Sequence, residues 1–340
     1  MSFQELNSDQ RREVVNTQQR YGAYREAVER AKGYRGSMVW AQLKGRDYLV
    51  RSAYSKSGVR RQTSLGPRSE QTEAIKLEFD HGRAEAQNRL KTLKDVLARQ
   101  AAVNRALGLG RVPLIGAKII RALDQAAMLG SGIRVLGTNA IYAYEAAAGV
   151  HIDPGLTSTE DIDLLFDTRG GLTFAASEDL SQASLLQLLR KIDRSFTRSR
   201  QTFRAVNDEG YLVDLIKPLR NPPWSKESQK VGADEGDLAA AEIEGLAWHE
   251  SAPSFAAIAI DEKGEPCRIV ASDPRVWAAH KLWLSQRHDR EPTKRRRDGL
   301  QARTVGRLVA EYMPHLPYDS EQLKMLPKAV FDQAAPLFRI

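Results

Sequence analysis

The stretch "TSTEDIDLLFD" (residues 157–167) places two carboxylates, Asp161 and Asp163, one residue apart at the start of a short apolar run. Alternate side chains of a β-strand point to the same face, so a strand here would project both carboxylates together. Such a pair can hold Mg²⁺, which prefers oxygen ligands and keeps water and substrate phosphates in its shell. A solvated strand end or a cap would also use these residues, so the choice between a metal site and these alternatives depends on the neighbouring sequence.

A glycine upstream of this pair favours the metal site. In "VLGTNAIYAYE" (135–145), Gly137 lies where a predicted strand becomes a helix, with Thr138 or Asn139 expected at the helix cap and Gly149 at its end. A glycine at such a junction lets a phosphate approach the backbone, and the helix N-terminus offers free N–H groups. A glycine that serves only the turn or the packing is the alternative reading.

A third carboxylate follows on a later strand. In "YLVDLIK" (211–217), Asp214 interrupts an otherwise apolar run. A carboxylate in that setting is costly unless it pairs with a cation or a metal, so half of a structural ion pair is the competing interpretation. Lys217 would leave that face of the strand and is expected to have a structural partner of its own. Together, the three features predict a phosphate-handling metal site.

Composition bounds what the protein can be. The 340 residues are 42% hydrophobic and 28% charged, which is typical of about two soluble globular domains. The single cysteine, Cys267, excludes an internal disulfide and suits a reducing, cytoplasmic setting. The start is polar, and the most apolar stretch (126–150) is broken by Arg134 and Glu145, so neither a signal peptide nor a membrane span is expected. The net charge of +8 suits a polyanionic partner or a phosphate-bearing substrate.

Periodicity and turn residues predict a mixed α/β chain with N-terminal helices and a small β-meander at 1–112, a mixed-sheet core at 113–272 and a C-terminal helical domain at 273–340. The helices are expected at 8–32, 69–106 with a break near Gly82, 114–128, 138–149, 177–193, 274–286, 293–312 and 319–336. The strands are expected at 38–66 as a meander, then at 133–137, 161–167, 195–206, 210–218, 243–248, 254–260 and 267–271.

The segments "VLGTNAIYAYE", "STEDIDLLFD" and "YLVDLIK" together resemble the polymerase-β-like nucleotidyltransferase superfamily. Its shared pattern is a strand, Gly-Ser/Gly and a helix, then Asp-x-Asp/Glu, with a third carboxylate on a later strand. This resemblance covers roughly residues 131–218. The whole chain, including "VWAQLKGRDYLVRSAY" and "DPRVWAAHKLWLSQR", resembles a bacterial branch known only as nucleotidyltransferase-fold proteins.

The resemblance implies a small mixed sheet backed by helices and a role for each motif. Asp161 and Asp163 would bind two Mg²⁺ ions, with Mn²⁺ as an alternative, and Asp214 would be the third ligand and help to deprotonate the acceptor hydroxyl. Gly137, Thr138 and the adjoining helix start would contact the triphosphate of ATP or another NTP. The reaction would be in-line transfer of a nucleoside monophosphate with release of pyrophosphate.

Two departures from the superfamily pattern stand out. Thr138 replaces the usual Ser or Gly, which retains the hydroxyl on a β-branched residue and weakens the phosphate role. The insertion "GVHIDPGLTS" (149–158) lengthens the gap before Asp161 and predicts a loop over the site.

Basic residues near the C-terminus are further candidates for nucleotide binding. In related nucleotidyltransferases a C-terminal helical domain supplies cations to the triphosphate or the acceptor. Lys281 and Arg287 are similar in placement, and Asn139 joins Thr138 as a nucleotide contact at the start of its helix. For the run Lys294 to Arg297, a solvated helix face is the competing interpretation.

The meander at 38–66 interleaves basic residues with Trp40, Tyr48 and Tyr54. Such a pattern suits single-stranded nucleic acid, and a dimer or domain contact explains it as well. The basic residues are Lys44, Arg46, Arg51, Lys56, Arg60 and Arg61.

Other functions that use an Asp-x-Asp pair fit less well. A glycosyltransferase needs neither Gly137 nor Asp214, and a haloacid-dehalogenase-type phosphatase has its pair after the apolar run, not before it. A non-catalytic nucleotide- or nucleic-acid-binding module, or a toxin-like partner on the same fold, remains the alternative. The acceptor is open among an RNA or tRNA end, a protein and a small molecule, with RNA or protein favoured by the charge and the meander.

Overall fold

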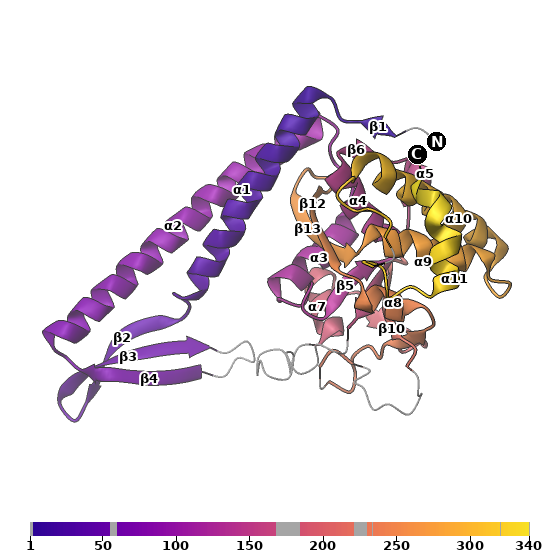
Figure 1. Cartoon of the computed structure of the whole chain (residues 1–340). Coiled ribbons are helices and arrows are strands. Elements are labelled where there is room, and N and C mark those ends of the chain that lie inside the picture. The colour runs from indigo at the N-terminus through magenta and orange to yellow at the C-terminus, as the bar shows by residue number, and fades with distance from the viewer. Residues whose placement is uncertain are drawn as a thin grey trace. The chain divides into compact units, whose positions relative to one another are not determined.

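The computed structural model describes residues 3–54, 60–167, 184–220, 230–232, 234–319 and 321–339 (Figure 1). The chain is mixed α/β, with 49% helix and 23% strand, so the predicted fold class is confirmed. It divides into two compact units, which are residues 12–108 and residues 1–11 with 109–340. We call them the hairpin unit and the sheet unit.

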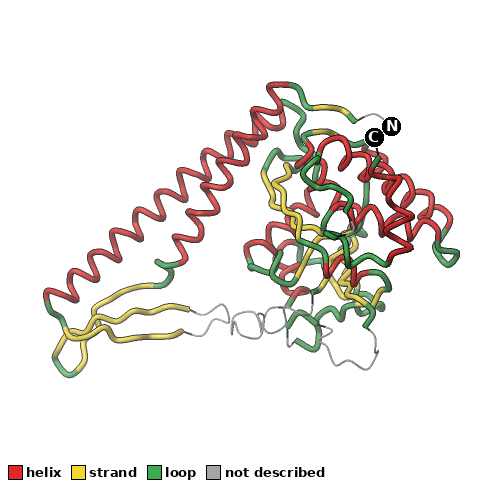
Figure 2. Tube along the Cα trace, in the orientation of Figure 1, coloured by secondary structure: helices red, strands yellow, loops and turns green. Residues whose placement is uncertain are grey.

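In the hairpin unit two long helices pack in antiparallel fashion, and three strands connect them in the sequence and lie at one end of the pair (Figure 2). Near one end, the Thr17 hydroxyl lies 3.1 Å from Asn104 Oδ1 in a buried polar contact. Ser69 caps the second helix through a reciprocal capping box with Thr72. The predicted helices and meander are thus confirmed as α1 (Ser8–Lys32), β2 (Ser37–Leu43), β3 (Arg46–Tyr54), β4 (Arg60–Pro67) and α2 (Glu70–Ala106).

Gly82 does not break α2, contrary to the prediction. The helix runs through it, and a Cβ at this position would collide with the ring of Tyr34. The glycine therefore serves a close side-chain approach, which outweighs its low helix propensity of about 1 kcal/mol relative to alanine.

The sheet unit is built on an eight-stranded mixed sheet in which β10 pairs with β7, β9 and β11. The order is β12-β13-β5-β7-β10-β9-β8, with β11 beside β10, while β1 (Gln4–Glu5) and β6 (Val150–His151) form a separate pair. The remaining strands are β5 (Ile133–Leu136), β7 (Asp161–Phe166), β8 (Thr197–Arg198), β9 (Arg204–Val206), β10 (Leu212–Pro218), β11 (Ala241–Ile243), β12 (Ser254–Ile260) and β13 (Pro266–Ser272).

The main core forms on one face of this sheet. Ile162, Leu164 and Phe166 of β7 all enter it, because they alternate along the strand with Asp161 and Asp163. The helices of the unit are α3 (Leu114–Gln125), α4 (Ile141–Ala148), α5 (Pro154–Thr157), α7 (Leu185–Ile192), α8 (Leu246–Ser251), α9 (Pro274–Gln286), α10 (Pro292–Tyr312) and α11 (Lys328–Ala334), with 3₁₀ turns η1 (Thr138–Ala140) and η3 (Ala335–Phe338). In the described part of the chain, none of the helices has the length and apolarity that crossing a bilayer requires.

Four local predictions are wrong. The single strand expected at 195–206 is divided into β8 and β9, which pair in antiparallel fashion. The strand expected at 243–248 is replaced by the end of β11 and by α8, and the helix expected at 319–336 begins only at Lys328. Neither Thr138 nor Asn139 caps a helix through its side chain, because a 3₁₀ turn comes between Gly137 and α4. Gly149 does end α4 in the left-handed conformation, as predicted, and most of the predicted helix 177–193 lies outside the described residues.

Candidate active site

The three carboxylates named by the sequence come together on adjacent strands. β7 and β10 are parallel neighbours, and Asp163 is in register with Asp214 while Asp161 is in register with Leu212. Residues in register on neighbouring strands point to the same face of a sheet. Asp161, Asp163 and Asp214 therefore share the face of the sheet opposite the main core.

Apolar residues lie beside the carboxylates on that face. Leu136 of β5, Leu165 of β7 and Ile216 of β10 form a small buried cluster with Leu246 of α8. The carboxylates occupy the first half of β7 and the cluster its second half. The site is thus the polar end of an otherwise buried face.

Gly137 lies directly against Asp163. Its backbone has φ 58° and ψ −150°, a conformation open essentially to glycine alone, and a Cβ there would overlap Asp163 Oδ2. The indole Nε1 of Trp277 donates to the Gly137 carbonyl over 3.1 Å and holds this turn in place. The glycine predicted for phosphate approach therefore brings its backbone against a carboxylate.

The environment of Asp163 disfavours its negative charge. Burial, and then the neighbouring charge of Asp161, raises the pKa of Asp163 to about 6. Lys281 and Arg290 act in the opposite direction from a distance, and neither makes an ion pair with it among the described residues. A cation placed between Asp161 and Asp163 would relieve this repulsion.

Asp214 has its own cation. Arg204 of β9 donates to both carboxylate oxygens, over 2.7 Å from Nε and 2.6 Å from Nη2, and Asp214 is only 7% exposed. The hydrogen bonds to Asp214 raise the pKa of Arg204, which stays charged. The structural ion pair considered from the sequence is therefore present. Lys217 has the structural partner expected of it, Glu242 at 3.2 Å.

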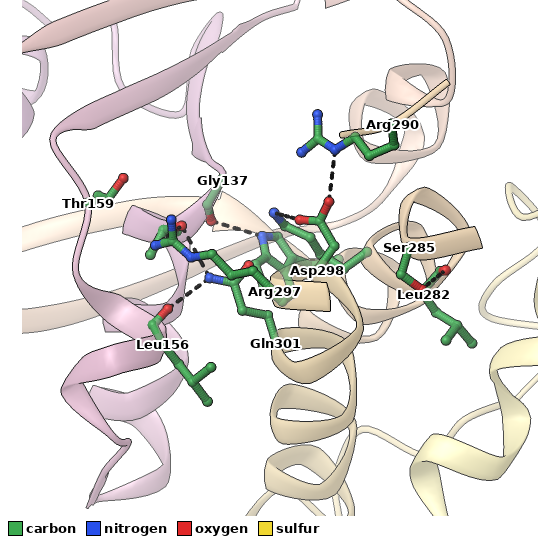
Figure 3. Close-up of polar contacts among 12 residues, drawn as sticks. Gly137, Leu156, Thr159, Leu282, Ser285, Arg290, Arg297, Asp298 and Gln301 are labelled. Carbon is green, nitrogen blue, oxygen red and sulfur yellow. Dashed lines mark hydrogen bonds and ion pairs between the residues drawn. The ribbon is translucent and has the colours of Figure 1, made fainter. Parts of the chain in front are cut away.

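A group of cations on the C-terminal helices adjoins the carboxylates. Asp298 of α10 binds Lys281 of α9 at 2.7 Å and Arg290 at 3.0 Å (Figure 3). The Asp298 side chain is 3% exposed, so this buried carboxylate holds the two cations in fixed positions. Both charges reach Asp163 electrostatically.

Helix α10 also contacts the turn after Gly137. Arg297 and Gln301 donate to the Thr138 hydroxyl over 3.3 and 3.2 Å, and in Figure 3 both side chains extend toward that turn. Gln301 additionally donates to the Leu156 carbonyl over 2.8 Å, and Arg297 donates to the Ser158 carbonyl. The inserted segment 149–158 is thereby tied to α10.

Asn139 and Arg287 lie apart from these contacts. Asn139 is 1% exposed, and its amide donates to the Asp161 carbonyl over 2.7 Å, so it positions the carboxylate strand. Arg287 pairs with Glu244 at 2.6 Å and with Asp289 at 2.8 Å in an exposed cluster. Of the two basic residues predicted from the C-terminal region, the structure brings Lys281 to the site and leaves Arg287 in that surface cluster.

The donor set suits a hard divalent ion. Carboxylate oxygens are the ligands that Mg²⁺ prefers, and Asp161 and Asp163 make no ion pair among the described residues. In those same residues, no three His, Cys, Asp or Glu side chains are grouped tightly enough to hold an ion as they stand. Asp161 accepts from the Thr159 hydroxyl and Asp214 is bound by Arg204, so Asp161 and Asp163 are the residues available to a metal.

Several site residues could not be named from the sequence. Arg204, Arg290 and Asp298 lie 10 to 135 residues from the motif carboxylates they serve, and their partners are set by strand register and helix packing. Gln301 carries no sequence signal. Arg297 belongs to a run that is typical of a solvated face, yet it contacts Thr138.

Comparison with known proteins identifies a family for this chain. A family described as "Nucleotidyltransferase" matches residues 116–326, which is more than half of the chain and includes all three carboxylates. Searches of curated proteins and of solved structures gave no match.

Proposed function

The chain belongs to this nucleotidyltransferase family, and from that premise we propose that it transfers a nucleoside monophosphate from an NTP to an acceptor hydroxyl and releases pyrophosphate. We further propose that the reaction uses Mg²⁺ held by Asp161 and Asp163, on a core of the polymerase-β-like type.

One observation carries the proposal. Asp161 and Asp163 project together beside Asp214, and burial and then the charge of Asp161 raise the pKa of Asp163 to about 6. Among the residues that the structure describes, neither Asp161 nor Asp163 makes an ion pair. Such an arrangement costs stability without a ligand, and retaining it is typical of a site that binds a cation. The Gly137 turn against Asp163 and the nearby cations are compatible with the same reaction.

The chain's own residues have separate roles in this reaction. Lys281 and Arg290, fixed by Asp298, balance the charge of the triphosphate, and the Gly137 turn lets a phosphate approach the backbone. Asp214, oriented by Arg204, accepts the proton of the acceptor hydroxyl. The hydroxyl oxygen bonds to the α-phosphorus as the bond to the bridging oxygen of pyrophosphate breaks. Bound Mg²⁺ would supply Lewis-acid stabilisation of the charge on the reacting oxygens.

The test is transfer of label from each α-labelled NTP, with Mg²⁺ and a cell lysate as the source of acceptor. Asp161→Ala and Asp163→Ala should abolish the transfer, because the proposed metal ligands are removed. The matched control is Asp208→Ala, an exposed aspartate of the same unit, which should transfer label like the wild type.

Two results would count against the proposal. Transfer that survives in both site variants would show that the reaction occurs elsewhere. No label from any of the four NTPs, with nucleotide binding intact, would favour the alternative of a non-catalytic binding module.

A further inference from the structure

The positive charge of the chain is concentrated in the hairpin unit. Residues 12–108 contain 20 Lys and Arg against 10 Asp and Glu, a net charge of +10, whereas the other residues contain 31 against 33 and carry −2. The whole-chain charge of +8 therefore comes from the unit without the carboxylate motif. A domain with a large net positive charge is typical of proteins that bind a polyanion.

Within this unit the three-stranded sheet has one covered face. Met38 of β2 and Leu49 of β3 pack on Phe79 of α2, and Arg51 stacks on the same ring with its guanidinium 4.2 Å from the centroid. Asp47 and Arg68 also lie on this side, where Arg68 pairs with Asp47 at 3.4 Å. Residues 33–69 contain eight basic residues and one acidic residue, Asp47. That single carboxylate lies on the covered face.

The opposite face combines cations with an aromatic ring. Tyr48 alternates with the buried Leu49 along β3 and so projects from this outer face, as does the exposed Arg46. Arg60 of β4 lies over the same face, where its Nε donates to Ser52 Oγ over 3.2 Å. Val39 and Leu43 are 42% and 61% exposed beside them. In the described part of the hairpin unit, no acidic residue lies on this outer face.

The hairpin unit has further cations near the junction of its helices and its sheet. A hollow of about 290 Å³ lies between the end of α1, the start of β2 and α2. Its lining includes Lys32, Arg35 and Arg83 and no acidic residue among those described. Lys32 pairs with Glu29 of the same helix, so Arg35 and Arg83 are the cations of this hollow that add to the positive charge of the unit.

We propose that the outer face of the β2–β4 sheet, with the adjoining cations, binds a single-stranded nucleic acid. Exposed cations reach the phosphates, and an aromatic ring on a strand stacks a base whatever its identity. A second copy of the chain is disfavoured, because an isologous contact would place identical positive faces together. Naming the bound strand as the acceptor rests on the proposed nucleotidyl transfer; the binding itself does not.

Binding is measured by fluorescence anisotropy of a labelled single-stranded RNA over a series of salt concentrations, with the full chain and without nucleotide or metal. Lys44→Gln/Arg46→Gln removes two exposed cations whose side chains make no ion pair or hydrogen bond to the described residues. It should weaken binding and reduce the salt slope by about 0.7 for each phosphate that is no longer neutralised. Tyr48→Leu should weaken binding roughly 10-fold with the slope unchanged, as removal of base stacking requires.

The matched control is Lys324→Gln/Lys328→Gln, which removes the same charge from exposed positions of the sheet unit and should bind like the wild type. Equal weakening by this control, or no weakening by the sheet variants, would overturn the proposal. So would equal affinity for a duplex of the same sequence, or displacement of the RNA by polyglutamate at matched charge, which would indicate an acidic protein partner.

Two further measurements distinguish RNA from single-stranded DNA as the ligand, and nucleic-acid binding from catalysis. Single-stranded DNA of the same sequence shows whether the surface distinguishes the two sugars; tighter binding of RNA supports it as the acceptor, and equal binding supports a general single-strand surface. Asp161→Ala/Asp163→Ala should bind RNA like the wild type, so failure of catalysis leaves this inference standing and failure of binding leaves the catalytic proposal standing.

Discussion

At Gly137 a single hydrogen atom in place of a methyl group allows the backbone to lie against a carboxylate. The residue has φ 58°, and its missing Cβ would overlap Asp163 Oδ2. Gly210 has a similarly positive φ of 83°, but nothing lies within 4 Å of a Cβ there. A side chain at Gly210 would therefore meet only backbone strain, whereas a side chain at Gly137 would meet both strain and a clash with Asp163.

Gly137→Ala is expected to lower the free energy of unfolding by roughly 3 kcal/mol or more, through strain and overpacking together, and to abolish nucleotidyl transfer. Gly210→Ala should cost only the strain, about 1–2 kcal/mol, and leave the transfer intact. Urea unfolding and the labelled-NTP assay measure both effects. Equal costs at the two positions would mean that the Asp163 contact is unimportant.

At the level of elements, the connection between α9 and α10 fixes the cations. Asp298 of α10 holds Lys281 of α9 and Arg290 from the connecting segment, and all three are brought together by helix packing. Arg287 lies at the end of α9 but pairs with Glu244 and Asp289 instead. Lys281 within α9 is thus held by a buried carboxylate, whereas Arg287 at its end pairs with exposed carboxylates.

Lys281→Gln is expected to raise the KM for NTP roughly 10-fold with a smaller change in kcat, because a charge-assisted hydrogen bond to phosphate is removed. Arg287→Gln should leave both constants near the wild-type values. Steady-state kinetics with varied NTP distinguish the two. A larger effect at Arg287 would assign the phosphate contact to the surface cluster.

At the level of the whole molecule, the sheet unit encloses two neutral histidines. His249 and His280 are 1% and 6% exposed, with ring centroids 4.6 Å apart, and His249 Nδ1 lies 2.7 Å from Ser272 Oγ. Burial, and then the charges of Lys281 and Arg134, lowers the pKa of His249 to about 3. Burial also lowers the pKa of His280 well below its usual value. Protonating either ring within the fold is therefore unfavourable near neutral pH.

The unit should therefore become less stable in mild acid. The folded pKa of His249 is below its unfolded value of about 6.5, so its contribution is present above pH 6.5 and declines as the pH falls. Between about pH 6.5 and 5 the decline is about 2 kcal/mol for His249, and His280 acts in the same direction. Urea unfolding at both pH values should show a smaller pH dependence in His249→Asn, while the exposed control His81→Asn should behave like the wild type. An unchanged pH dependence in His249→Asn would exclude this histidine as a cause.

Local sequence patterns determined the elements and the motif residues of this protein. Alternation of apolar residues with Asp161 and Asp163 predicted β7 and its two faces, and the meander, α1, α2, α9 and α10 were predicted to within a few residues. These features depend on the side-chain period of strands and helices, which short segments carry by themselves. Three such motifs predicted a phosphate-handling metal site, their resemblance to a known superfamily implied the nucleotidyltransferase class, and the family match agrees with that class.

Only the tertiary structure decided which charges meet. Strand register placed Arg204 on Asp214, helix packing placed Asp298 between Lys281 and Arg290, and close packing of Tyr34 explained a glycine inside α2. No periodic pattern in the sequence indicates these contacts, because each joins residues of different elements that only the folded chain brings together. The sequence determined where the carboxylates lie along their strands, and the packing of the folded chain decided that, among the described residues, Asp214 pairs with Arg204 while Asp161 and Asp163 make no ion pair.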